Sequence, residues 1–99
     1  MSISKHELAA FAACLRREER SSGTVEKYRR DAAAFAAWLG CCELTRETAA
    51  RWRDHLLREG YAPATINSML SAVNALLRFL GREDCKIRFL RVQRKAFRE

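Results

Sequence analysis

Residues 63–80, PATINSMLSAVNALLRFL, are the stretch that decides the fold. Apolar side chains recur in it at intervals of three and four residues, which is the period of one face of an α-helix. Proline stands at its first position, where a helix accepts it, and Gly81 follows its end. The stretch therefore predicts an amphipathic helix. Its apolar stripe consists of Ile66, Met69, Leu70, Val73, Leu76, Leu77 and Leu80.

Three further helices are predicted before it. The first starts at a capping box formed by Ser4 and Glu7 and runs to about residue 19. After a break at residues 20–23 a second helix continues to residue 39, and a third begins at its cap Thr45 and stops at Gly60. Because 99 residues can build one core only, we expect a single all-α, four-helix bundle.

Two tryptophans, Trp38 and Trp52, are the expected large residues of this core. The four cysteines lack C-x-x-C spacing and histidine partners, so they predict neither a metal site nor a disulfide framework. We expect reduced, buried thiols and no cofactor. The chain shows no leader-like start and no apolar run long enough to cross a bilayer, which favours a cytoplasmic protein without a membrane partner.

The positive charge is concentrated at the C-terminal end. The chain carries a net charge of +7, and residues 85–99, with six basic side chains and one acid, contribute +5 of it. Such a balance favours a polyanionic partner, although arginine-rich surfaces also occur on proteins without one. We expect residues 1–84 to form the domain and residues 85–99 an extended basic linker, because this linker has no second face to pack against.

Two motifs carry a resemblance to a known family. Residues 22–39 read SGTVEKYRRDAAAFAAWL and residues 65–80 read TINSMLSAVNALLRFL. With Leu44, Thr45 and the Gly60 turn between them, they resemble the two signature helices of the SAM-like core-binding domain of phage integrases, which are tyrosine recombinases. The resemblance covers about residues 21–80, and residues 92–97 are similar to the connector that leads into the catalytic domain of some integrases.

The resemblance implies an orthogonal SAM-like bundle that clamps duplex DNA together with a catalytic domain of the same parent chain. Its role would be strand exchange in DNA integration or recombination, and its other partners would be neighbouring recombinase protomers. Catalysis would belong to the other domain. His55 and Arg58 do form an H-x-x-R pair, but they fall in the predicted third helix, and we interpret the match as chance. Tyr28 is a core aromatic by its spacing, and neither it nor Tyr61 is placed as a nucleophile.

DNA contacts are expected on the second and fourth helices and on the linker. Four polar residues of the fourth helix follow one another at spacings of four, three and four, which places them on one side of the helix: Asn67, Ser71, Asn74 and Arg78. No acid occurs between residues 62 and 81. Ser22 and Thr24 would bind a phosphate or simply cap their helix, and both readings stay open. The expected DNA-contacting residues are Ser22, Thr24, Lys27, Arg30, Thr65, Asn67, Ser68, Ser71, Asn74, Arg78, Lys86, Arg88, Arg91, Arg94 and Lys95.

Two other functions compete with this one. The bundle could be a protein–protein interaction module that binds a partner through its first helix. It could also be a small DNA-binding regulator of the helix-turn-helix type, but the helices on either side of the Gly60 turn are too long for that motif.

Overall fold

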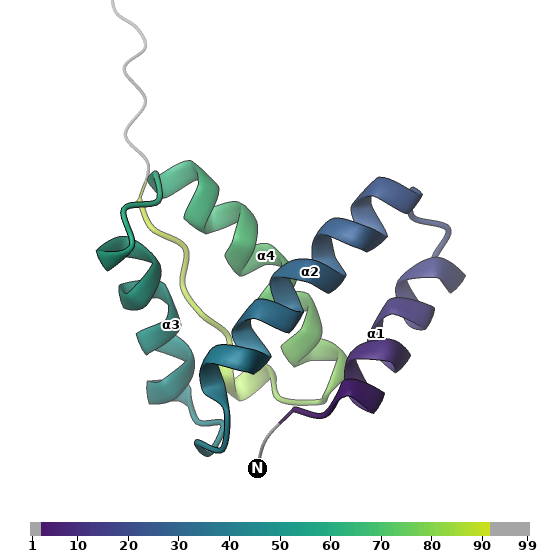
Figure 1. Ribbon diagram of the computed structural model, residues 1–99, viewed down its shortest axis with the longest axis horizontal. Coiled ribbons are helices and arrows are strands. Elements are labelled where there is room, and N and C mark those ends of the chain that lie inside the picture. Colours follow the sequence, from purple (N-terminus) through teal and green to yellow (C-terminus); the bar gives the residue numbers. More distant parts are fainter. Residues whose placement is uncertain (1–2, 92–99) are drawn as a thin grey trace, which may run out of the picture.

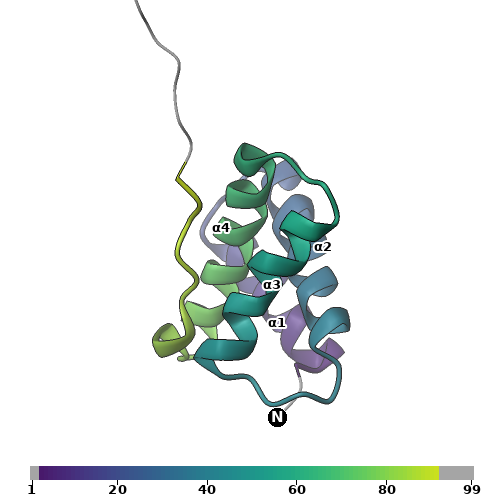
Figure 2. The same cartoon turned by 90° about the vertical axis from the view of Figure 1, so that its left-hand side faces the viewer.

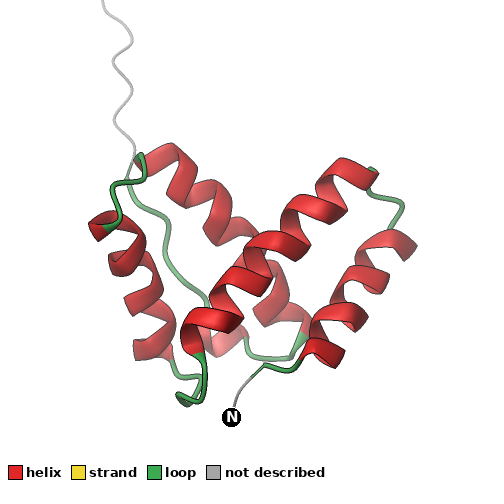
Figure 3. Cartoon of the chain, viewed as in Figure 1, coloured by secondary structure: helices red, strands yellow, loops and turns green. Residues whose placement is uncertain are grey.

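The computed structural model describes residues 3–91, and four helices make up most of this part of the chain. No strand occurs among these residues, as Figure 3 shows. Helix α2 crosses α4, with α1 on one flank of the crossing and α3 on the other (Figure 1). The predicted all-α bundle is confirmed. Its elements are α1 (Lys5–Arg17), α2 (Ser22–Leu39), α3 (Arg46–Arg58), α4 (Pro63–Phe79) and the short 3-10 helix η1 (Glu83–Cys85).

Three of the helices start as their sequences predict. The Ser4 hydroxyl accepts a hydrogen bond from the Glu7 amide at 3.1 Å, and the Glu7 carboxylate accepts one from the Ser4 amide at 2.9 Å. The Thr45 hydroxyl caps α3 and accepts from the Thr48 amide at 3.1 Å. Pro63 occupies the first position of α4, where its missing N–H leaves no bond unmade.

The connection between α1 and α2 differs from the prediction. Helix α1 ends at Arg17, and Glu19 takes a φ of 61°, a left-handed conformation that stops the helix short of the expected end. Helix α2 already begins at Ser22, because the Ser21 hydroxyl accepts the Thr24 amide at 3.1 Å and acts as the cap. The predicted break at residues 22 and 23 is therefore wrong, and Ser22 is not the cap of α2.

The core lies where α2 and α4 cross. Phe35 is fully buried and meets the Trp52 ring edge-on at a centroid distance of 5.7 Å. Trp52 is buried as expected, whereas Trp38 is only partly buried and stacks along the outside of this aromatic pair. From α4, the core receives the fully buried side chains of Ile66, Leu70, Ala72, Val73, Leu76 and Leu77.

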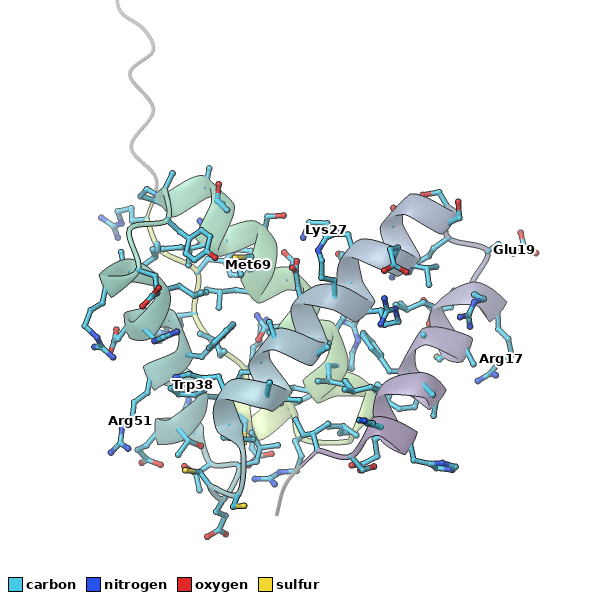
Figure 4. All side chains as sticks on the ribbon, in the orientation of Figure 1. Arg17, Glu19, Lys27, Trp38, Arg51 and Met69 are labelled. Carbon is cyan, nitrogen blue, oxygen red and sulfur yellow. The ribbon has the colours of Figure 1, made fainter. Side chains whose placement is uncertain are left out.

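A single lysine joins the N-terminal halves of α2 and α4. The Lys27 ammonium donates to the Asp31 carboxylate at 2.6 Å and to the backbone carbonyl of Ser68 at 3.2 Å. Asp31 is the one buried charged residue in the described part of the chain. Lys27 therefore neutralises a buried carboxylate and ties two helices together. In Figure 4 it lies in the opening between the two helices, close to Met69.

The chain does not leave the bundle after η1. Residues 86–90, which we name the strap, run alongside α4 on the side away from α2 (Figure 2). The Asn74 side chain donates to the Ile87 carbonyl at 3.0 Å and accepts from the Ile87 amide at 2.9 Å. The Asn67 side chain makes the same pair of bonds with Leu90, at 2.9 and 2.7 Å.

Burial confirms that the strap belongs to the folded domain. Cys85 is fully buried and Ile87 is 2% exposed, and both are part of the single core. The expectation that the segment after residue 84 has no face to pack against is therefore wrong for residues 85–90. The reason is that two asparagines satisfy its backbone, so apolar side chains can enter the core without unpaired amides.

The cysteines also depart from the prediction in part. All four are free thiols, but Cys41 and Cys42 are exposed in the turn after α2 and Cys14 is half-buried. Only Cys85 is buried, and burial raises the pKa of its thiol above the usual value. Buried thiols are thus confirmed at one position of the four.

The burial of Ile87 predicts a large stability difference between two neighbouring substitutions. Ile87→Ala should lower the free energy of unfolding by about 2–5 kcal/mol, because it leaves a cavity in the core. Phe89→Ala should lower it by less than about 0.5 kcal/mol, since Phe89 is 52% exposed. Urea denaturation followed by circular dichroism measures both. Equal small losses would show that the strap does not belong to the core.

The Lys27 link predicts a similar contrast between two ion pairs of α2. Lys27→Ala should lower the free energy of unfolding by about 1–2 kcal/mol, because it leaves the Asp31 carboxylate buried without its charged donor. Arg29→Ala should lower it far less, because Arg29 pairs with the exposed Glu26 and both groups remain solvated. The same denaturation experiment compares them, and an equal loss in both variants would contradict the tethering role of Lys27.

Candidate nucleic-acid interface

The N-terminal halves of α2 and α4 lie on either side of an opening above the point where the two helices cross (Figure 1). The bond between Lys27 and the Ser68 carbonyl links the two helices near this crossing. Arg30 is exposed on α2, and Thr65 and Ser68 are exposed on α4. Thr24, half-buried, lies one turn before Lys27. We name the surface formed by Thr24, Lys27, Arg30, Thr65 and Ser68 the α2–α4 face.

The α2–α4 face combines hydrogen-bonding groups with little negative charge. Its carboxylate, Asp31, is neutralised by Lys27, and α4 contains no acidic residue. Arg30 makes no ion pair with the described residues, so its N–H groups are open to an anion, and the carboxylate one turn before it on the same helix, Glu26, is paired with Arg29. Gly23, Ala34 and Ala64 are exposed and small, so no bulky side chain protrudes at these positions. A guanidinium and several hydroxyls on such a surface suit phosphates and base edges.

Asn67 and Asn74 do not lie on this face. Helical spacing places both on one side of α4, as expected, but the expectation that this side is open to base edges is wrong. Their side-chain amides are bonded to the strap, which covers that side of α4. The Ser71 hydroxyl, half-buried, donates to the carbonyl of Asn67 within its own helix at 3.2 Å.

Two further residues of the expected set lie away from the α2–α4 face. Arg78 is exposed near the end of α4, where it lines a shallow hollow of about 170 Å³ together with Glu18 and Arg20. Ser22 lies on the flank of α2 that faces α1, beside Arg16 and Arg20.

Tyr28 packs against the core, as its spacing predicted. The cationic groups of Arg20 and Lys27 both lie 5.6 Å from the centre of its ring. Cations at this distance from an aromatic face are attracted to it, so Tyr28 helps to hold both side chains in place.

A second cluster of positive charge lies between α3 and the strap. Lys86 and Arg88 of the strap, both exposed, line a hollow of about 370 Å³ with Arg46 and Arg53 of α3. Sequence reasoning missed the two arginines of α3. The available signal was their separation of seven residues, which places two side chains on the same side of a helix. Arg91 is exposed just after the strap, whereas the expected sites Arg94 and Lys95 lie outside the described residues.

The histidine of the H-x-x-R pair takes part in packing, and the arginine does not. The His55 ring stacks on Trp52 at 5.4 Å and lies 5.7 Å from Trp38, while Arg58 is exposed at the end of α3. Among residues 3–91, no group of three or more histidine, cysteine or acidic side chains is placed to bind a metal ion. In the same part of the chain, none of the helices has the length and apolar character needed to cross a membrane.

Comparison with known proteins agrees with these features. Residues 8–84 match the family described as phage integrase, N-terminal SAM-like domain. The match includes all four helices apart from the first three residues of α1, and it ends just before the strap. No curated protein and no solved structure gives a significant match. Since the matched region covers well over half of the chain, this protein belongs to the family of phage integrase N-terminal SAM-like domains.

Proposed function

We propose that this domain binds duplex DNA as the core-binding domain of a site-specific tyrosine recombinase, with the α2–α4 face against the duplex. The observation that carries the proposal is the composition of this face. An unpaired guanidinium and hydroxyl groups lie on two adjoining helices, and the carboxylate among them is already neutralised. The membership of the integrase family supports the same role.

The arrangement favours a division of labour between the helices. Arg30 would contact a phosphate, because a guanidinium binds the phosphate oxygens through two parallel N–H bonds. Thr65 and Ser68, on the helix without acidic residues, would approach base edges and phosphates through their hydroxyls. Lys27 would contribute mainly by holding the two helices at a fixed separation, since its charge is matched by Asp31. The proposed partners are duplex DNA, the catalytic domain of the parent chain and neighbouring protomers.

One observation favours the interaction module as a second candidate function. A hollow of about 520 Å³ lies between the start of α1 and the C-terminal half of α2, and its lining is largely apolar. Ile3, Leu8 and Ala33 are among its lining residues. Exposed apolar surface of this kind occurs at protein–protein contacts, so a helix of a partner is the alternative ligand of this domain.

The proposed function predicts weak duplex binding with a steep dependence on salt. The logarithm of the affinity should fall by about 0.9 for each phosphate contacted per tenfold rise in salt. Arg30→Ala should make this slope shallower by about 0.9 and weaken binding to all duplexes alike. Fluorescence anisotropy with a labelled duplex of about 20 base pairs at several salt concentrations measures both quantities.

Arg17→Ala is the matched control for this experiment. Arg17 is also an exposed arginine, but it points outward from α1 on the far flank of the molecule (Figure 4). Its loss should leave the slope unchanged. The proposed DNA-binding face would be wrong if both variants behaved alike. Absence of binding at the lowest salt concentration would overturn the DNA-binding function and favour the interaction module.

A further inference from the structure

The hollow between α3 and the strap is lined by more cationic side chains than acidic ones. Four cations line it, Arg46, Arg53, Lys86 and Arg88, and Glu47 is the carboxylate beside them. Glu47 forms no ion pair with any residue between 3 and 91, nor do Arg46, Lys86 and Arg88. By contrast, in the hollows beside α1, Arg20 pairs with Glu18, and Glu26 pairs with Arg29.

These cations come together although they repel one another. Two of them belong to α3 and two belong to the strap, so the strap brings positive charge against positive charge. Neutral interactions contribute to holding it: four hydrogen bonds between the Asn67 and Asn74 side chains and the strap backbone, and the burial of Ile87. An anion in the hollow would remove the repulsion and add charge-assisted hydrogen bonds.

One of the cations also holds the strap directly. A terminal nitrogen of the Arg53 guanidinium donates to the carbonyl of Arg88 at 2.8 Å. This bond uses one N–H and leaves the remaining N–H groups of Arg53 for a ligand. The same guanidinium is therefore fixed in position before any ligand arrives, which lowers the entropy lost on binding.

We propose that the hollow between α3 and the strap is a phosphate-binding site, and that Asn67 and Asn74 are positioning residues that assemble it. The phosphate belongs to the backbone of a nucleic acid, and this assignment rests on the proposed function. Arg46, Arg53, Lys86 and Arg88 bind the phosphate oxygens. Asn67 and Asn74 touch no phosphate and act through the strap, which carries two of the four cations.

Binding and docking of the strap are then linked. A ligand that binds only the docked strap stabilises it by an amount that grows with the ratio of ligand concentration to Kd. The amides of Ile87 and Leu90 report this directly, because each donates to an asparagine oxygen only when the strap is docked. Their hydrogen exchange should slow when the site is occupied.

Inorganic phosphate tests the site without a nucleic acid. Hydrogen exchange of the folded domain is followed by NMR in phosphate and in chloride at matched ionic strength and pH. Phosphate should slow the exchange of the Ile87 and Leu90 amides several-fold, and this effect should disappear in Arg46→Ala. Arg51→Ala is the control, because Arg51 lies on the other side of α3 and points into solvent (Figure 4). No slowing in the wild-type domain would overturn the phosphate site.

Duplex binding tests the source of the phosphate. Arg46→Ala should make the salt slope shallower by about 0.9, and Arg51→Ala should leave it unchanged. Asn74→Ala removes no charge, yet it should also make the slope shallower. In the double variant with Arg46→Ala, the change in slope should be smaller than the sum of the changes in the two single variants. A purely structural role of Asn74 would lower stability and leave the slope as it is. Asn67→Ala provides the same test at the other end of the strap.

The outcomes separate this inference from the proposed function. Arg30→Ala could weaken duplex binding while Arg46→Ala binds the duplex as Arg51→Ala does. This result would support DNA binding by the α2–α4 face and would show that nucleic acid is not the ligand of the hollow. If phosphate protects the strap but no duplex binds at any salt concentration, the phosphate site stands and the DNA-binding function falls.

Discussion

The structure depends on a match between two distances, one along helix α4 and one along the strap. Asn67 and Asn74 are seven residues apart on α4, which is about 10.5 Å along a helix that rises 1.5 Å per residue. Ile87 and Leu90 are three residues apart on the strap, which is about 10 Å for an extended chain. Each asparagine side chain can therefore satisfy both the N–H and the C=O of one strap residue, and the two pairs of bonds form without distortion.

This match determines which side of α4 contacts the strap and which side remains exposed. One side carries Ile66, Leu70 and Val73 into the core, and the asparagine side binds the strap. The side that remains open contains Ser68, next to Lys27 of α2. The arrangement gives two positively charged regions, the α2–α4 face and the hollow beside α3, on different flanks of one helix. The helix that organises the core also positions both regions.

Most of the fold could be predicted from the sequence. The spacing of apolar residues in α4 and the caps at Ser4 and Thr45 are local signals, and the structure confirms them. The start of α2 was misjudged because Ser21 and Ser22 are both good capping residues, and only the geometry shows which one accepts the amide of Thr24. The docking of the strap depends on contacts between distant parts of the chain, and no local pattern in residues 85–90 predicts it.

The candidate site was harder to predict for the same reason. Helical spacing showed that Asn67 and Asn74 share one side of α4, but the partner of that side depends on where the chain returns after η1. Arg46 and Arg53 gained their significance only because the strap lies against α3. Lys27 looked like a cation available to a phosphate, whereas the burial of Asp31 gives it a carboxylate partner within the fold.

The most direct test of this account follows the asparagine side chains while a duplex is added. In an NMR titration of the isotope-labelled domain, the backbone signals of Thr65 and Ser68 should shift, because they lie on the open side of α4. The side-chain amide signals of Asn67 and Asn74 should keep slow hydrogen exchange throughout, because their bonds to the strap persist. Loss of that protection on DNA binding, with the two asparagine side chains moving to contact the duplex, would contradict the account.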